Sequence, residues 1–261
     1  VDRVAAMGEK LSANILAATL RSLGQQARCV DATQMLLTDS NFGGAMPLLE
    51  ETRVRAQHLL QPLIADGIVP VITGYIGADA TGTTTTLGRG GGDYSAAIFG
   101  AVLNADEVWI WTDVDGILTA DPKIVPKART LAELTYVEAA QLAYFGAEVL
   151  HPKTVKPLVD MGIPLRIRNT FNPKHPGTLI VARSSREDSG PRAIITSKDL
   201  SAIAVVGDSD GWSPEISARA LGALSRAGVE VLMFGQSFVE RTVSLLVRGQ
   251  DAGHALRTLR R

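Results

Sequence analysis

The chain has 261 residues, of which 46% are hydrophobic and 20% charged, with a formal net charge of −1. This composition is typical of a globular protein and excludes disordered and fibrous classes. A nearly neutral chain has no global field for nucleic acid or an anionic membrane, so we expect neither partner. No apolar run reaches the roughly 20 residues of a membrane helix. The single cysteine, Cys29, excludes an intrachain disulfide and a cysteine metal site. No signal peptide is recognised, and a cytoplasmic protein is expected.

Helices and strands alternate through the first part of the chain. Apolar periodicity predicts helices over residues 11–23, 50–66, 93–104, 136–144 and 153–161. Apolar and β-branched runs predict strands over residues 27–31, 68–73, 83–87, 108–112, 164–168 and 178–181. These strands are apolar throughout, which is typical of a mostly parallel sheet covered by helices on both faces. The predicted fold is therefore α/β with three layers, αβα.

A second, smaller unit follows a polar segment that closes with Gly190-Pro191. Behind it, strands are expected at 201–206, 229–234 and 242–247, and helices at 214–227 and 251–259. The order β-α-β-β-α is one strand short of a ferredoxin-like unit. The predicted domains are 1–182 for the α/β domain, 183–192 for the linker and 193–261 for an incomplete α+β regulatory domain.

A glycine-rich turn, Gly88-Arg89-Gly90-Gly91-Gly92-Asp93, separates a predicted strand from a predicted helix that Asp93 is expected to cap. Backbone N–H groups beside a helix N-terminus favour anions, and Arg89 adds a fork suited to a carboxylate. The turn is neither a Walker A loop nor a dinucleotide fingerprint, because no Gly-Lys pair and no third fingerprint glycine are present. A purely structural turn remains the alternative.

An acidic stretch, Thr112 to Lys123, follows the predicted strand 108–112. It should lie at a carboxyl edge of the sheet, where open α/β sheets bind ligands. The spacing of its acidic residues does not fit an EF-hand, and no glutamate closes the loop. A plain turn is the alternative reading of this stretch.

Two stretches, TTTTLGRGGGDYSAA and WTDVDGILTADPK, in this order resemble the aspartate kinases of the amino-acid-kinase superfamily. Further stretches extend the resemblance from about residue 4 to residue 181: MGEKLSANILAATLRSLG, FGAEVLHPKTV and IPLRIRNTFNPKHPGTLI, the last most like the aspartokinase halves of bifunctional enzymes. The stretch ISARALGALSRAGVEVLMFGQSFVERTVSLLV resembles an ACT domain, the regulatory module of that family. The family implies an amino-acid-kinase-like domain followed by an ACT domain.

The resemblance also implies roles for individual residues. Glu9 contacts the amino group of aspartate, Arg89 clamps a substrate carboxylate, and Asp93 orders that arginine. Gly90, Gly91 and Gly92 complete the substrate site. The nucleotide site consists of Thr112, Asp113, Leu118, Asp121, Pro122, Lys123 and Glu148. Gln236 lies where ACT domains of the family contact an amino-acid effector, although a plain surface role for it is an equal alternative. No protein residue is assigned to a metal.

The sequence also departs from the family. Relatives open with a Lys-Phe-Gly-Gly-Thr-Ser motif whose lysine neutralises the transferring phosphate, and the chain contains no such motif. The Asn41-Phe42-Gly43-Gly44 stretch is expected to be an unrelated loop. Glu148 stands where a phosphate-side lysine is usual, and Leu118 replaces a tyrosine beside the nucleotide. Residues 194–199 resemble the opening of a first ACT unit that is otherwise missing, an absence we attribute to omitted residues.

The resemblance implies an Mg²⁺-dependent aspartate 4-kinase that transfers the γ-phosphate of ATP to L-aspartate, the first step of lysine, threonine and methionine synthesis. It further implies lysine or threonine as effector and a homodimer or higher homo-oligomer through the ACT units. Two alternatives stay open. One is a kinase for another small acid, such as glutamate. The other is a catalytically inactive regulatory subunit that binds amino acids.

Overall fold

A computed structural model describes residues 1–144, 152–184, 190–207, 214–237 and 239–260. The chain forms two compact units, Val1–Thr196 and Ser197–Arg261. The boundary between the units falls shortly after the linker expected at 183–192. Within the described ranges, no helix is long and apolar enough to cross a membrane.

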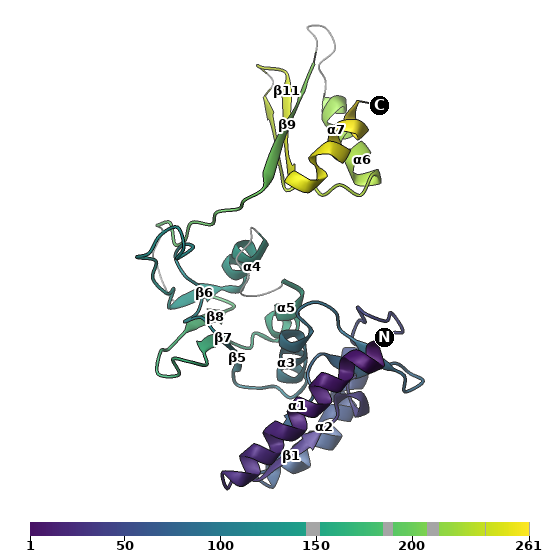
Figure 1. The fold of residues 1–261 in the computed structure, drawn as a ribbon, viewed down its shortest axis with the longest axis vertical. Helices are drawn as coiled ribbons and strands as arrows, with labels where there is room; N and C mark the ends of the chain where they lie inside the picture. The colour runs from purple at the N-terminus through teal and green to yellow at the C-terminus, as the bar shows by residue number, and fades with distance from the viewer. Residues whose placement is uncertain (145–151, 185–189, 208–213, 238, 261) are drawn as a thin grey trace. The chain divides into compact units, whose positions relative to one another are not determined.

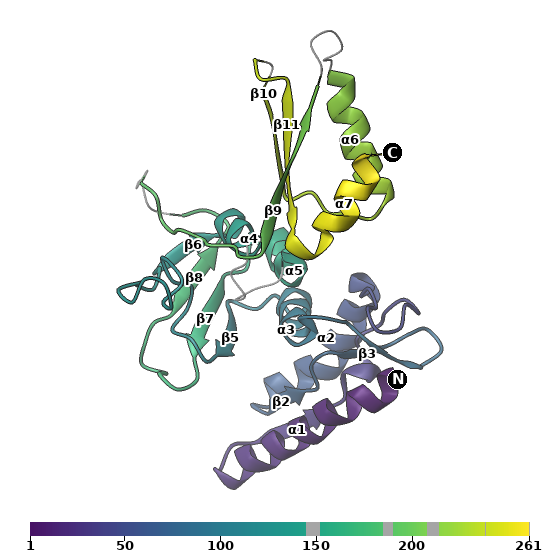
Figure 2. The same ribbon diagram turned by 45° about the horizontal axis from the view of Figure 1, so that its top comes forward.

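Unit 1 begins with two long helices that run alongside a pair of parallel strands (Figures 1 and 2). The elements are α1 (Asp2–Ser22), β1 (Ala27–Val30), the 3-10 helix η1 (Ala32–Gln34), α2 (Leu49–Ala65) and β2 (Val69–Ile72). Small side chains bring α1 close to the strands, since Ala13 and Ala17 pack with Ala27 and Val71. Helix α1 therefore packs against β1 and β2 through the face that carries these alanines.

Helix α3 connects two hydrophobic cores of unit 1. It spans Gly91–Val102 and follows an antiparallel hairpin of β3 (Ile76–Ala78) and β4 (Thr84–Thr86). Ile98 and Phe99 pack into the core shared with α1 and α2, whereas Ala97 packs into the core of the four-stranded sheet. Gly100 lies so close to Val108 that a Cβ atom there would clash. This packing fixes the start of α3 relative to both cores.

The second core of unit 1 covers a four-stranded sheet in the order β5-β7-β8-β6 (Figure 2). Its elements are β5 (Val108–Thr112), β6 (Glu133–Thr135), α4 (Tyr136–Tyr144), α5 (Pro152–Met161), β7 (Leu165–Asn169) and β8 (Thr178–Val181). Pairs β5/β7 and β6/β8 are parallel, and β7/β8 is antiparallel. Leu158 of α5 is fully buried with Ile167 and Ile180. On strand β5, Trp109 and Trp111 are exposed, and the Arg168 guanidinium lies over both rings.

Unit 2 packs two helices against a three-stranded antiparallel sheet. Its elements are β9 (Leu200–Val206), α6 (Pro214–Arg226), β10 (Met233–Ser237), β11 (Thr242–Arg248), the 3-10 helix η2 (Gly249–Asp251) and α7 (Ala252–Leu259). The strand order is β10-β11-β9, so β10 and β9 are edge strands. The core contains Leu224 of α6, Val243 and Leu245 of β11, and Ala255 of α7.

The structure confirms the α/β class and the β-α-β-β-α order of the second unit. Three expectations were wrong in detail. The helix expected at 11–23 begins at Asp2 and ends at Ser22. Asp93 does not cap its helix, because Gly90 is the N-cap and Asp93 lies in the first turn. The strand expected at 229–234 begins only at Met233, because Val229 turns into the core after Gly228 and the ladder with β11 starts later. The short strands β3 and β6 were not expected.

Candidate functional site

The glycine-rich turn leads directly from strand β4 into helix α3. Gly88 and Gly90 have φ values of 78° and 72°, a left-handed conformation that glycine adopts without strain. The first N–H groups of α3 have no partner within the helix, and the helix dipole adds partial positive charge there. The turn is therefore suited to an anion, as the sequence predicts.

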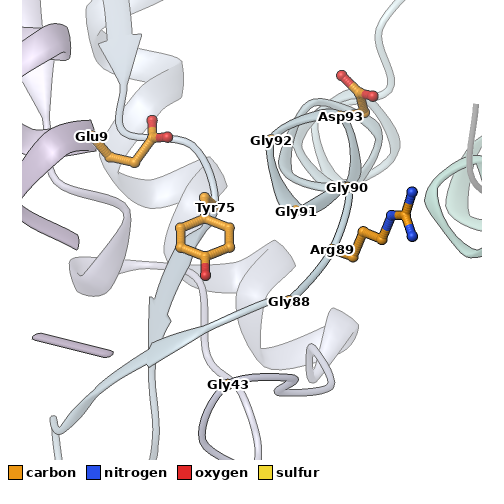
Figure 3. A pocket seen from close by; sticks show the side chains of 9 residues that line it. All are labelled: Glu9, Gly43, Tyr75, Gly88, Arg89, Gly90, Gly91, Gly92 and Asp93. Carbon is orange, nitrogen blue, oxygen red and sulfur yellow. The ribbon is translucent and has the colours of Figure 1, made fainter. Parts of the chain in front are cut away.

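A cavity of about 510 Å³ opens at this turn (Figure 3). Its lining comes from four separated segments of unit 1 and consists of Glu9, Gly43, Tyr75, Gly88, Arg89, Gly90, Gly91, Gly92 and Asp93. All six residues predicted for the substrate site thus surround one cavity. The loop carrying Gly43, expected to be unrelated, borders the same cavity. Tyr75 is a further lining residue that sequence reasoning did not single out.

Glu9 and Arg89 bring opposite charges to the cavity. The Glu9 carboxylate comes from α1 and lies near Gly74, where a Cβ atom would be 3.5 Å from its Oε2. In Figure 3 the Arg89 guanidinium lies on the far side of the glycine turn and points away from Glu9. Asp93 is half-buried, and burial raises the pKa of its carboxyl. Among the described residues no ion pair joins Asp93 to Arg89, so the structure does not itself order the arginine in the expected way.

The buried carboxylate of Asp2 ties three segments at the cavity together. It accepts hydrogen bonds from the backbone N–H of Gly43 (2.8 Å) and from the N–H and hydroxyl of Thr86 (2.9 and 3.0 Å). Burial raises the pKa of Asp2, but these hydrogen bonds outweigh it and hold the pKa below its ordinary value. The sequence did not identify Asp2, because its partner Thr86 lies 84 positions away.

The acidic stretch lies where the sequence placed it, at the carboxyl end of β5. Thr112 donates a hydrogen bond to Asp113 (3.2 Å), and Asp121 accepts one from the Lys123 N–H (2.9 Å). Leu118 forms an isolated bridge with Thr130. The predicted nucleotide residues in this stretch therefore lie in one loop that follows β5.

Asp115 fastens this loop to the segment after β7. Its Oδ1 accepts hydrogen bonds from the side-chain amides of Asn169 (2.8 Å) and Asn172 (3.1 Å). Asn169 is paired with Thr112 in the parallel β5/β7 ladder, so both lie at the same sheet edge. Neither Asp115 nor the asparagines were predicted, since each contact joins residues more than 50 positions apart.

Two predicted site residues lie elsewhere. Glu148 falls outside the described residues. Gln236 lies on β10 of unit 2, opposite Val243 in the ladder with β11. Its Nε2 is buried and has no hydrogen-bond partner among the described residues.

Residues 1–169 match the model of the amino acid kinase family, and residues 203–261 match that of an ACT domain. The chain belongs to the amino acid kinase family. This family member is 36% identical to the bifunctional aspartokinase/homoserine dehydrogenase of Haemophilus influenzae, over 94% of the chain and 30% of that protein. The resemblance to aspartokinases found in the sequence is thereby confirmed.

Solved structures of aspartokinases share the fold of this chain. Escherichia coli aspartokinase III in complex with aspartate and ADP is 34% identical, with a TM-score of 0.75, over 95% of this chain and 54% of that one. The same enzyme has also been solved with lysine and aspartate. Clostridium acetobutylicum aspartate kinase is 28% identical, with a TM-score of 0.85, over 100% and 58%. The chain therefore spans between about a third and three fifths of these relatives.

Proposed function

We propose that the protein is an aspartate 4-kinase, which transfers the γ-phosphate of ATP to the side-chain carboxylate of L-aspartate. The observation that carries the proposal is that Glu9, Arg89 and the glycine turn all line one cavity. An amino acid with two carboxylates needs an acidic group for its ammonium, a cationic group for a carboxylate and donors for the remaining oxygens. The cavity offers all three, and the solved E. coli relative holds aspartate and ADP.

The proposed reaction needs no general base. The side chain of aspartate has a pKa of about 4 and is already an anion at neutral pH, so it can attack phosphorus directly. The protein's task is to hold the two anions together. In the proposed arrangement Arg89 binds a carboxylate of the acceptor and Glu9 binds its ammonium. The backbone N–H groups of the glycine turn face the negative charge that the reaction redistributes.

ATP is proposed to bind in the loop after β5. The proposed contacts of ATP are Thr112, Asp113, Leu118, Asp121, Pro122, Lys123 and Glu148. Among the described residues, no three acidic, histidine or cysteine side chains cluster as a metal site. Mg²⁺, which supplies charge neutralisation when bound, is proposed to be held by the nucleotide phosphates and water.

Regulation is proposed to operate through the ACT unit. Gln236, with its unsatisfied buried amide, is the proposed contact for a lysine or threonine effector. The aspartokinase III structure with lysine supports lysine as the first effector to test. Met233 and Phe234 are exposed on edge strand β10, which supports a homo-oligomer built through this edge. A stable monomer in light scattering would count against that assembly. The lone cysteine is compatible with a cytoplasmic location.

The test is an ADP-release assay on the protein at its full natural length, with Mg·ATP and L-aspartate, L-glutamate or N-acetylglutamate offered separately. We expect turnover with aspartate and less than about a hundredth of it with either other acid, because a missed charged contact costs about 3 kcal/mol. Turnover with glutamate alone would support the kinase of another acid. No turnover, with lysine still binding by calorimetry, would support the regulatory subunit.

A further inference from the structure

Tyr75 is a bulky residue in a backbone conformation that normally favours glycine. Its φ is 66°, in the left-handed region. A side chain with a Cβ is strained there, and such strain persists only where the surroundings enforce it. Strained residues concentrate at ligand-binding sites, and Tyr75 lines the cavity described above.

Hydrogen bonds hold the Tyr75 backbone in this conformation. Its N–H donates to the Ser95 hydroxyl (2.7 Å), which in turn donates to the carbonyl of Gly91 (2.7 Å). The Tyr75 carbonyl accepts from the N–H of Leu87 (2.9 Å). Ser95 is only 3% exposed, so water does not compete for these bonds. Tyr75 is therefore clamped to both ends of the glycine turn.

The ring of Tyr75 is fixed by its packing on the same turn. A Cβ atom on Gly91 would lie 2.6 Å from the Cδ2 of Tyr75 and 3.1 Å from the Cβ of Leu87. The ring thus rests against the α-carbon of a glycine, and a larger residue at that position would displace it.

The hydroxyl of Tyr75 is available to a ligand. Figure 3 shows it pointing away from the carboxylate of Glu9, toward the side of the cavity where Gly43 and Gly88 lie. It makes no hydrogen bond within the part of the chain that the structure describes. The clamp therefore holds a free O–H donor at the end of the cavity bordered by the glycine turn. That turn favours an anion, so an anionic oxygen is the acceptor that suits this hydroxyl.

We infer that Tyr75 is a substrate-binding residue whose hydroxyl donates a hydrogen bond to a carboxylate oxygen of the acceptor acid. The inference rests on the proposed function and deepens it. The guanidinium of Arg89 neutralises a carboxylate of the acceptor, whereas the hydroxyl of Tyr75 is a hydrogen-bond donor in a fixed position. An acceptor whose carboxylate does not reach that point leaves the hydroxyl unpaired, so Tyr75 also contributes to selectivity.

The experiment compares Tyr75→Phe with Tyr94→Phe in the full-length protein. Both changes remove one phenolic hydroxyl and keep the ring, and Tyr94 is a half-buried residue of α3 outside the cavity lining. We expect Tyr75→Phe to raise the KM for aspartate about tenfold, as loss of a hydrogen bond to a charged group predicts. The KM for ATP should stay within about twofold, and Tyr94→Phe should change neither value.

An unchanged KM for aspartate in Tyr75→Phe, or an equal rise in both KM values, would overturn the inference. Calorimetric titration with L-aspartate separates it from the proposed function. If the wild-type protein binds aspartate without turning over, and Tyr75→Phe binds it about tenfold more weakly, then the inference stands and the kinase proposal fails. If the wild-type protein does not bind aspartate at all, both fail.

Discussion

Replacing Gly91 with alanine tests the packing on which the cavity depends, and Gly92 supplies a matched control one residue away. A Cβ on Gly91 would meet the ring of Tyr75 at 2.6 Å, whereas a Cβ on Gly92 has no atom within 4 Å. Both positions lie in the first turn of α3, so both variants gain up to about 1 kcal/mol from the helix preference of alanine. Only Gly91→Ala also incurs overpacking, which costs about 1–3 kcal/mol.

Gly91→Ala should therefore be less stable than Gly92→Ala by about 1–3 kcal/mol. For a unit of this size, that corresponds to a thermal midpoint lower by about 2–10 °C, measured by scanning calorimetry on the full-length protein. Displacement of the ring should also weaken aspartate binding in Gly91→Ala. Equal midpoints for the two variants would refute the contact between Tyr75 and Gly91, and with it the fixed position of the tyrosine hydroxyl.

The remaining predictions concern the acceptor, the nucleotide loop and acid stability. Arg89→Ala should lower affinity for aspartate far more than affinity for ATP, because the guanidinium is assigned to the acceptor; equal losses by calorimetry would contradict the assignment. Asp115→Ala should raise the Kd for ATP several-fold, because it removes the hydrogen bonds that hold the loop after β5. The control Asp160→Ala, at an exposed position, should leave this Kd unchanged. Both values are measured by titration with the nucleotide. Burial raises the pKa of Glu138, but hydrogen bonds from Thr135 and Arg192 outweigh it and lower that pKa below 4.5. The ionised Glu138 therefore stabilises the fold fully above pH 4.5, and this contribution is lost as the pH falls. The difference in free energy of unfolding between the wild-type protein and Glu138→Gln should consequently become smaller in acid. A difference in free energy of unfolding that becomes larger below pH 4.5 would contradict this prediction.

Local pattern was sufficient to predict most elements of the fold. Strand β5, the glycine turn and helix α3 are visible in the sequence as an apolar run, a glycine-rich break and a run of small residues. The predicted start of the strand at 229–234 was wrong because alternating valines indicate which face is buried but not where the pairing with a neighbouring strand begins. The prediction that Asp93 caps the helix was wrong because the helix already begins after Gly90, which is its N-cap.

The site itself was only half predictable. Glu9 and Arg89 belong to stretches that resemble the aspartokinases. Gly43 and Tyr75, by contrast, line the cavity only because of the tertiary fold, and Asp2 holds Gly43 through a tertiary hydrogen bond. Asp2 binds residues 41 and 84 positions away, and no local pattern reports such partners. Tyr75 looks like an ordinary apolar residue between a glycine and a strand. Only its left-handed backbone marks it as unusual.

The most direct test of the central claim is hydroxylamine trapping of the acyl phosphate. The full-length protein is incubated with Mg·ATP, hydroxylamine and either L-aspartate or L-glutamate, and the hydroxamate formed is quantified. An aspartate 4-kinase produces aspartyl hydroxamate in an ATP-dependent reaction, no product from glutamate, and much less product after Arg89→Ala. Absence of hydroxamate from aspartate with the folded, full-length protein would contradict the account.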